Sequence, residues 1–67
     1  MADHSTTNYY EAYPSEGYWR FKVYHYDKAG NKEINIFRSF LLYGEKEEAE
    51  DAAVEWLDAN KIEAESV

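Results

Sequence analysis

The hydrophobic pattern of this chain changes its period at Gly44, and this change constrains the fold more than any other feature of the sequence. From Tyr18 to Tyr26 apolar and polar residues alternate with a period of two, which is typical of a strand with one buried face. From Glu45 the apolar residues recur at helical spacing and form one stripe. This stripe consists of Ala49, Ala52, Ala53, Trp56 and Leu57. The sequence therefore predicts an α+β fold with strands first and one amphipathic C-terminal helix last.

Two further segments fit strands before and after Tyr18–Tyr26. Asn8–Tyr13 is short and rich in tyrosine, and Glu33–Tyr43 is rich in β-branched and aromatic residues. The stretches Pro14–Gly17 and Asp27–Lys32 indicate a turn and a hairpin loop, because Pro, Gly and Asn accept the dihedral angles that turns need. We expect a three-stranded antiparallel meander that is packed on one face by the single C-terminal helix.

The central strand has two faces of different chemistry. One face alternates Trp19, Phe21, Val23 and His25, and we expect it to meet the helix. We interpret His25 as a half-buried, hydrogen-bonded residue rather than a catalytic one. Because one helix covers only one face of the sheet, the other face stays open. That open face carries Tyr18, Arg20, Lys22, Tyr24 and Tyr26.

The alternation in the third predicted strand slips near its middle. Ile34 and Ile36 are expected to face the core, with Phe40 and Leu42 in phase. The same phase also brings Arg38 to the core face. A β-bulge near Arg38 reconciles the pattern by shifting the phase of the later residues.

A chain of 67 residues permits one domain and no more. It has no Cys, so it has neither a disulfide nor a thiolate metal site, and its core depends on aromatic packing. We expect residues 1–7 to be a disordered tail, residues 8–62 to form the domain and residues 63–67 to fray. Asn60 is expected as a left-handed helix stop, with Ile62 packing back on the last turn.

The sequence shows no membrane or export signal. No stretch approaches the ~20 apolar residues of a membrane span, and the polar N-terminus lacks the apolar run of a signal peptide. We therefore expect a cytoplasmic protein, in the host cytoplasm if the chain is phage-encoded, with no membrane partner.

The formal net charge is −7, and all of the excess lies in the C-terminal third of the chain. Residues 1–44 hold five acids and five bases, whereas residues 45–67 hold nine acids and two bases. An electrically lopsided molecule steers charged partners. The acidic side of the predicted helix is formed by Glu47, Glu48, Glu50, Asp51, Glu55 and Asp58.

Catalytic and cofactor motifs are lacking in the sequence. There is no Cys nucleophile, and His4 and His25 are the two histidines. No His-x-x-His or Glu-x-x-His spacing occurs, and the three glycines form no phosphate-binding loop. An exposed acidic helix cannot wrap a Ca²⁺ ion as a loop does. We expect no enzymatic activity, no catalytic residues, no cofactor and no metal.

The open sheet face suggests one kind of partner, because aromatic rings stack on bases and cations contact phosphates. Residues 17–60 resemble the AP2 and integrase-arm type of DNA-binding domain. The resemblance rests on the run Gly17–Val23, the glycine-containing hairpin, and Glu47–Ala49 with Ala52–Ala53 in the closing helix. It implies a three-stranded sheet in the major groove, with Arg20, Lys22 and Arg38 as DNA contacts. A simpler interpretation is that Tyr, Arg and Lys side chains cover an open sheet face.

The acidic helix suggests a different kind of partner, a protein with a basic surface. The helix then acts as a DNA mimic, with its carboxylates in the place of phosphates. In kind, though without a shared motif, such a chain resembles the small acidic phage-encoded inhibitors of host machinery, such as anti-CRISPR proteins. A plain solvated helix face remains the simpler interpretation. The leading hypothesis is a protein–protein binder, monomeric or homodimeric; nucleic-acid binding is second and is disfavoured by the net charge.

Overall fold

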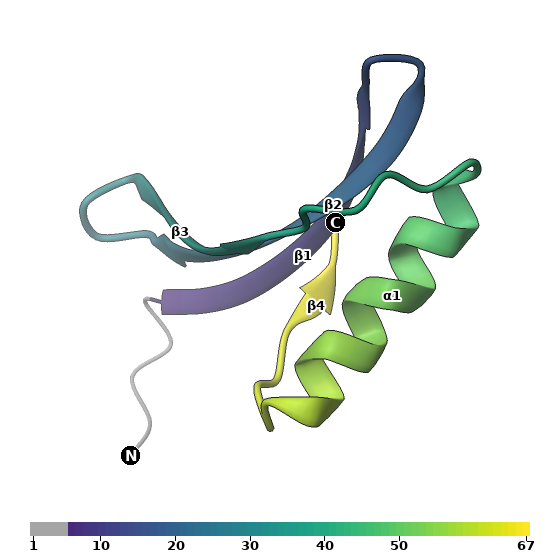
Figure 1. The fold of residues 1–67 in the computed structure, drawn as a ribbon. Helices are drawn as coiled ribbons and strands as arrows, with labels where there is room; N and C mark the ends of the chain where they lie inside the picture. The colour runs from purple at the N-terminus through teal and green to yellow at the C-terminus, as the bar shows by residue number, and fades with distance from the viewer. Residues whose placement is uncertain (1–5) are drawn as a thin grey trace.

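Four strands and one helix form the part of the chain, residues 6–67, that the computed structural model describes. The elements are β1 (Thr6–Ser15), β2 (Tyr18–Asp27), β3 (Lys32–Arg38), α1 (Lys46–Ala59) and β4 (Glu65–Ser66). The strands form one sheet in the order β3-β2-β1-β4, with α1 on one face (Figure 1). The predicted α+β class is confirmed, but the sheet is mixed and has one strand more than expected. The predicted disorder of residues 1–5 lies outside the described residues, whereas Thr6 and Thr7 belong to β1.

The first hairpin is longer and tighter than the sequence indicated. β1 pairs with β2 over ten residues, from Thr6 opposite Asp27 to Ser15 opposite Tyr18. The turn shrinks to Glu16 and Gly17, whose φ angles are 55° and 82°. Two consecutive positive φ angles are the geometry of a type I′ turn, whose twist matches that of the flanking strands. Pro14 therefore belongs to the strand and not to the turn.

A β-bulge lies in β3, two residues earlier than predicted. Val23 pairs with Phe37 and Tyr24 pairs with Asn35, so Ile36 is the extra residue on β3. The bulge brings Phe37, rather than Ile36, to the helix side of the sheet. The prediction that Ile34 and Ile36 lie in the core is wrong, since they are 52% and 40% exposed.

The physical reason is the position of the helix. α1 contacts β1 and β2, and the β2–β3 loop lies at the far end of the sheet from it (Figure 1). Ile34 pairs with His25 and shares its face, but it lies beyond the area that the helix covers.

The third strand ends at Arg38, and the chain then crosses to the helix without strand structure. Ser39 is buried: its N–H donates to the Phe21 carbonyl (2.9 Å), and its Oγ accepts from the Phe21 N–H (3.1 Å). Tyr43 exchanges two backbone hydrogen bonds with Trp19, at 2.7 and 2.8 Å. These contacts tie down both ends of the segment 40–42 but leave its side chains outside the core. Phe40 and Leu42, expected in phase with the core, are exposed.

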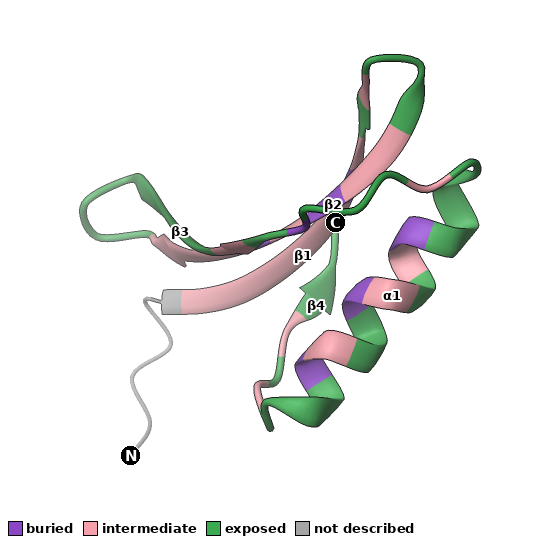
Figure 2. Ribbon diagram, in the orientation of Figure 1, coloured by how far each residue is buried: buried purple, intermediate pink, exposed green. Residues whose placement is uncertain are grey.

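The core lies where α1 crosses the first hairpin. Ala49, Ala53 and Leu57 are buried on the helix and pack against buried residues of β1 and β2; Figure 2 shows the buried residues of α1 in purple. The sheet contribution is Ala12, Phe21 and Val23. Small alanines allow a close approach of helix and sheet, so the predicted helix stripe and strand face are confirmed. Trp56 is only half-buried and covers the edge of this core rather than its centre.

Both ends of α1 are capped. At the start, the Glu45 N–H donates to Glu48 Oε1 (3.1 Å), and Glu45 has extended dihedrals. At the end, Ile62 N–H donates to the Leu57 carbonyl (2.9 Å) and Lys61 N–H to the Asp58 carbonyl (3.2 Å), which is a Schellman motif. The left-handed residue is Lys61, with φ 55°, and not Asn60 as predicted. Ile62 packs against the core, as expected.

The C-terminal segment forms a strand where fraying was expected. Glu65 and Ser66 pair in parallel with Tyr9 and Tyr10, and Val67 N–H donates to the Tyr10 carbonyl (3.2 Å). The Schellman turn reverses the chain direction after α1, which brings the segment back along the free edge of β1. This addition makes the sheet mixed.

Candidate functional site

The outward side of α1 is the acidic face. Glu47, Glu48, Asp51, Glu55 and Asp58 are exposed there, while Glu50 is half-buried. Three ion pairs exist among the described residues, and none of them involves α1. The helix carboxylates therefore form no direct ion pair with a cation of this part of the chain.

The six acidic residues are not all equally available to contact a partner. Glu48 accepts the Glu45 N–H, so it has a structural role as part of the helix cap. Glu47 also lies in the first turn, where a carboxylate complements the helix dipole. Asp51, Glu55 and Asp58 follow at spacings of four and three residues, which place them on one exposed side of the helix. These three are the best candidates for contact with a partner.

The tyrosine face lies on the other side of the sheet. The five predicted residues, Tyr18, Arg20, Lys22, Tyr24 and Tyr26, alternate with the buried Phe21 and Val23 and so share one face. Register adds neighbours that the sequence alone did not place. Opposite them on β1 lie Tyr9, Glu11 and Tyr13, and on β3 lie Glu33, Asn35 and Arg38. Five of the seven tyrosines therefore gather on this face.

The tyrosine face is charge-balanced and not basic. Lys22 Nζ lies 2.9 Å from Glu33 Oε1 and 3.9 Å from Glu11 Oε1. Arg20 lies 3.6 Å from Glu16. The five predicted stripe residues share one face, but Glu11 of β1 and Glu33 of β3 lie against its central cation, Lys22.

Two titrating groups at the centre of this face have pKa values shifted by their neighbours. The hydrogen bond to Glu33 raises the pKa of Lys22 above its usual 10.5, against an opposing effect of burial. Burial raises the pKa of Tyr24 above its usual 10.0, and the carboxylates of Glu11 and Glu33 add to the shift. The Tyr24 ring lies under Lys22 Nζ at 5.1 Å and beside the Tyr9 ring at 5.8 Å. The charged group of Lys22 and the carboxylates of Glu11 and Glu33 are therefore already paired with one another within the protein.

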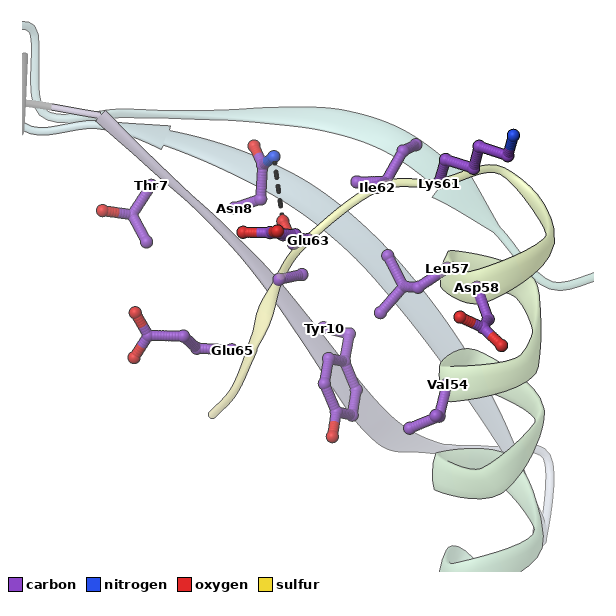
Figure 3. Close-up of a pocket in the computed structure, with 11 residues that line it drawn as sticks. Thr7, Asn8, Tyr10, Val54, Leu57, Asp58, Lys61, Ile62, Glu63 and Glu65 are labelled. Carbon is purple, nitrogen blue, oxygen red and sulfur yellow. Dashed lines mark hydrogen bonds between the residues drawn. The ribbon is translucent and has the colours of Figure 1, made fainter. Parts of the chain in front are cut away.

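A broad hollow of about 820 Å³ lies between β1, the end of α1 and the segment that leads to β4 (Figure 3). Tyr10, Leu57 and Ile62 give it an apolar part, and carboxylates such as Asp58 and Glu65 give it a polar part. The Asn8 Nδ2 group donates to the Glu63 carbonyl at 3.2 Å, which links β1 to the C-terminal segment (Figure 3).

His25 is half-buried and hydrogen-bonded, as expected. Its Nδ1 lies 2.8 Å from Asn8 Oδ1, and Asn8 in turn holds the C-terminal segment. Across residues 6–67 no three His, Asp or Glu side chains come together as a metal-binding group. Within the same residues no helix is long and apolar enough to cross a membrane.

A second, smaller hollow of about 410 Å³ lies between α1 and the segment 39–43. Phe37, Trp56 and Tyr43 form much of its lining, and Glu55 borders it. Sequence reasoning missed this feature because it placed Phe40 and Leu42 in the core. The signal was present in the run Phe40–Leu42, three large apolar residues in a row two residues before the strand-breaking Gly44.

The chain was compared with known proteins. No protein-family model matches it, and searches of curated proteins and of solved structures find no match.

Proposed function

We propose that this chain is a small, non-enzymatic binding protein that acts by protein–protein contact through the acidic face of α1. The observation that carries the proposal is the uncompensated charge of this face, since the ion pairs of the described residues all lie elsewhere. Exposed like charges on one helix are best satisfied by a partner with a basic surface. Such a partner is captured quickly because its charge steers the encounter.

The most concrete form of the proposal is an inhibitor of a nucleic-acid-handling complex. Five exposed carboxylates, those of Glu47, Glu48, Asp51, Glu55 and Asp58, lie along about 16 Å of helix axis. This is one charge per about 3 Å, close to the spacing of about 3.4 Å per phosphate along one DNA strand. A phage-type inhibitor, such as an anti-CRISPR or another anti-defence protein, that works in the host cytoplasm fits this chemistry.

Charge reversal at matched sites tests the proposal. The double variant Asp51→Lys and Glu55→Lys changes the acidic face but spares the cap residue Glu48. The control, Glu63→Lys with Glu65→Lys, makes the same change of net charge at exposed positions beyond the helix. Each tagged protein is used to capture partners from its source cell, followed by mass spectrometry. The proposal expects a partner that wild type and control retain and the helix variant loses. A partner retained equally by all three contradicts it.

The alternative function is nucleic-acid binding through the tyrosine face, as the AP2 and integrase-arm resemblance implies. The gathering of five tyrosines with Arg20, Lys22 and Arg38 favours it. The net charge of −7 and the carboxylates beside Lys22 count against it. A gel shift at low salt separates the two functions. Binding that is lost in Arg20→Ala with Lys22→Ala supports the alternative, and no shift contradicts it.

A further inference from the structure

The segment between β3 and α1 exposes apolar side chains that the fold does not use. Phe40 is 88% exposed and Leu41 is 67% exposed (Figure 2 shows this segment as exposed). Ser39 and Tyr43 fix both ends of the segment by backbone hydrogen bonds to β2, so its exposure is set by the fold. Phe40 and Leu41 are the most exposed pair of adjacent large apolar residues in the described part of the chain, and a contiguous apolar patch of this kind is typical of an interaction site.

These side chains stand beside the smaller hollow described above. Phe40 meets the edge of Phe37, with ring centroids 6.3 Å apart and planes at 90°. The Phe37 ring stacks on Trp56, so the hollow has a rigid aromatic wall. A volume of about 410 Å³ is large enough for one or two large apolar side chains.

The charge around the hollow favours a basic partner segment over a second copy of this chain. Glu55 borders it, and Glu48 lies two turns earlier on the same side of α1, with Ala52 between them. In a symmetric dimer formed about this hollow, the Glu55 border of one copy would face the same acidic border of the other, with a formal charge of −7 on each copy. Like charges at an interface oppose association, whereas Lys or Arg next to an apolar anchor is complementary.

We propose that the hollow and the Phe40–Leu41 pair form a docking site for a partner segment in which large apolar residues are flanked by Lys or Arg. This inference rests on the proposed function and defines its partner: the apolar residues enter the hollow, and the cations contact Glu55 and the acidic face beyond it. The two surfaces of α1 then act together, one supplying the anchor site and the other the charge.

The test uses three synthetic peptides and the nitrogen-15-labelled full chain in an NMR titration. The first peptide is Gly-Lys-Lys-Phe-Leu-Lys-Lys-Gly; the second replaces its lysines by glutamates, and the third replaces Phe-Leu by Ser-Ser. The proposal expects the first peptide to shift the Leu41 amide and the Trp56 indole signals with a Kd below about 1 mM. The other two should bind at least about tenfold more weakly.

Three variants locate the site. Leu41→Ser should weaken the first peptide at least about fivefold. Val67→Ser, at a residue that is likewise 67% exposed but lies beyond β4, should leave it unchanged. Glu55→Lys should remove the preference for lysine over glutamate.

Three results would overturn the proposal: no saturable shift, equal binding of lysine and glutamate peptides, or equal effects of Leu41→Ser and Val67→Ser. Shifts of Leu41 and Trp56 that depend on protein concentration alone would instead identify a second copy as the occupant. The proposed function fails separately. If Asp51→Lys with Glu55→Lys loses the cellular partner while Leu41→Ser keeps it, the docking site is wrong and the acidic-face function stands.

Discussion

Phe37 and Trp56 stack with their ring centroids 4.4 Å apart and their planes within 16° of parallel. This contact joins β3 to α1, which otherwise packs on β1 and β2, while Phe37 also lies against the buried Phe21 ring, with centroids 5.7 Å apart. It is possible only because the bulge at Ile36 turns Phe37 to the helix side of the sheet. The same ring pair forms the wall of the proposed docking site.

We predict that Trp56→Ala and Phe37→Ala each lower the free energy of unfolding by about 2 kcal/mol, since both side chains are half-buried rather than fully enclosed. Their effects should not add, because the stacked pair contributes about 1 kcal/mol beyond its area. Urea denaturation followed by circular dichroism measures all four proteins of the double-mutant cycle. Additive losses would show that the two rings do not act as a pair.

The stability of the fold should fall at alkaline pH. Both Lys22 and Tyr24 have pKa values raised above 10.5 and 10.0 in the folded state, by the Glu33 hydrogen bond and by burial respectively. A raised pKa means that the folded state holds the proton more tightly. Its stabilisation is therefore complete below the unfolded pKa and is lost as the pH rises through the folded one.

The measurement is the urea midpoint from pH 8 to above pH 10.5. Glu33→Gln should flatten the alkaline decline and lower the stability at pH 8 by about 0.5 kcal/mol, because the pair is partly exposed. The control Glu63→Gln, outside the ion pairs, should retain the full decline. If the alkaline decline is identical in all three proteins, the Lys22–Glu33 pair does not cause it, and the prediction is wrong.

Substitutions at the two turn residues should change the stability according to how readily each new residue adopts a positive φ. Glu16 has a φ of 55°, and Asn adopts this left-handed region more readily than Glu. We predict that Glu16→Asn raises the free energy of unfolding by about 0.5 kcal/mol, even though it removes an exposed ion pair with Arg20. Gly17→Ala, at a φ of 82°, should lower it by about 1 kcal/mol. Thermal melts of both variants check the opposite signs, and a common sign would contradict the turn geometry.

At the end of α1, glycine should have opposite effects on stability at two neighbouring positions. Lys61 is left-handed and Asn60 is not, so Lys61→Gly should stabilise the protein by about 0.5–1 kcal/mol. Asn60→Gly should destabilise it instead, because it adds freedom to the unfolded chain and removes the Asn60 Nδ2 bond to the Trp56 carbonyl (2.8 Å). Chemical denaturation of the two variants measures both effects. If Asn60→Gly stabilises the protein and Lys61→Gly does not, Asn60 rather than Lys61 is the left-handed residue.

The sequence predicted the fold correctly where a residue pattern was compatible with only one structure. The alternation around Phe21 and Val23 and the alanine stripe of α1 fixed the two surfaces that meet in the core. It was insufficient where the outcome depended on where the helix crosses the sheet. Ile34 and Phe37 both fit a buried strand position, and only the crossing point over β1 and β2 decides that Phe37 is covered.

The candidate surfaces divide in the same way. The acidic face follows from helical periodicity alone, so its residues were predictable. The neutralisation of Lys22 was not, because Glu11 and Glu33 each lie 11 residues away in sequence and reach it only through the strand register. The strand β4 has two residues and no pattern, so its parallel pairing with β1 depends on the Schellman turn that precedes it.

The most direct test of the acidic-face function is the association rate of the captured, purified partner at ionic strengths of about 0.05 M and about 0.5 M. Wild type and the Glu63→Lys, Glu65→Lys control should associate at least about tenfold more slowly at the higher salt, because screening removes the steering. The Asp51→Lys, Glu55→Lys variant should associate slowly at both. A rate that changes neither with salt nor with these two helix substitutions would contradict the account.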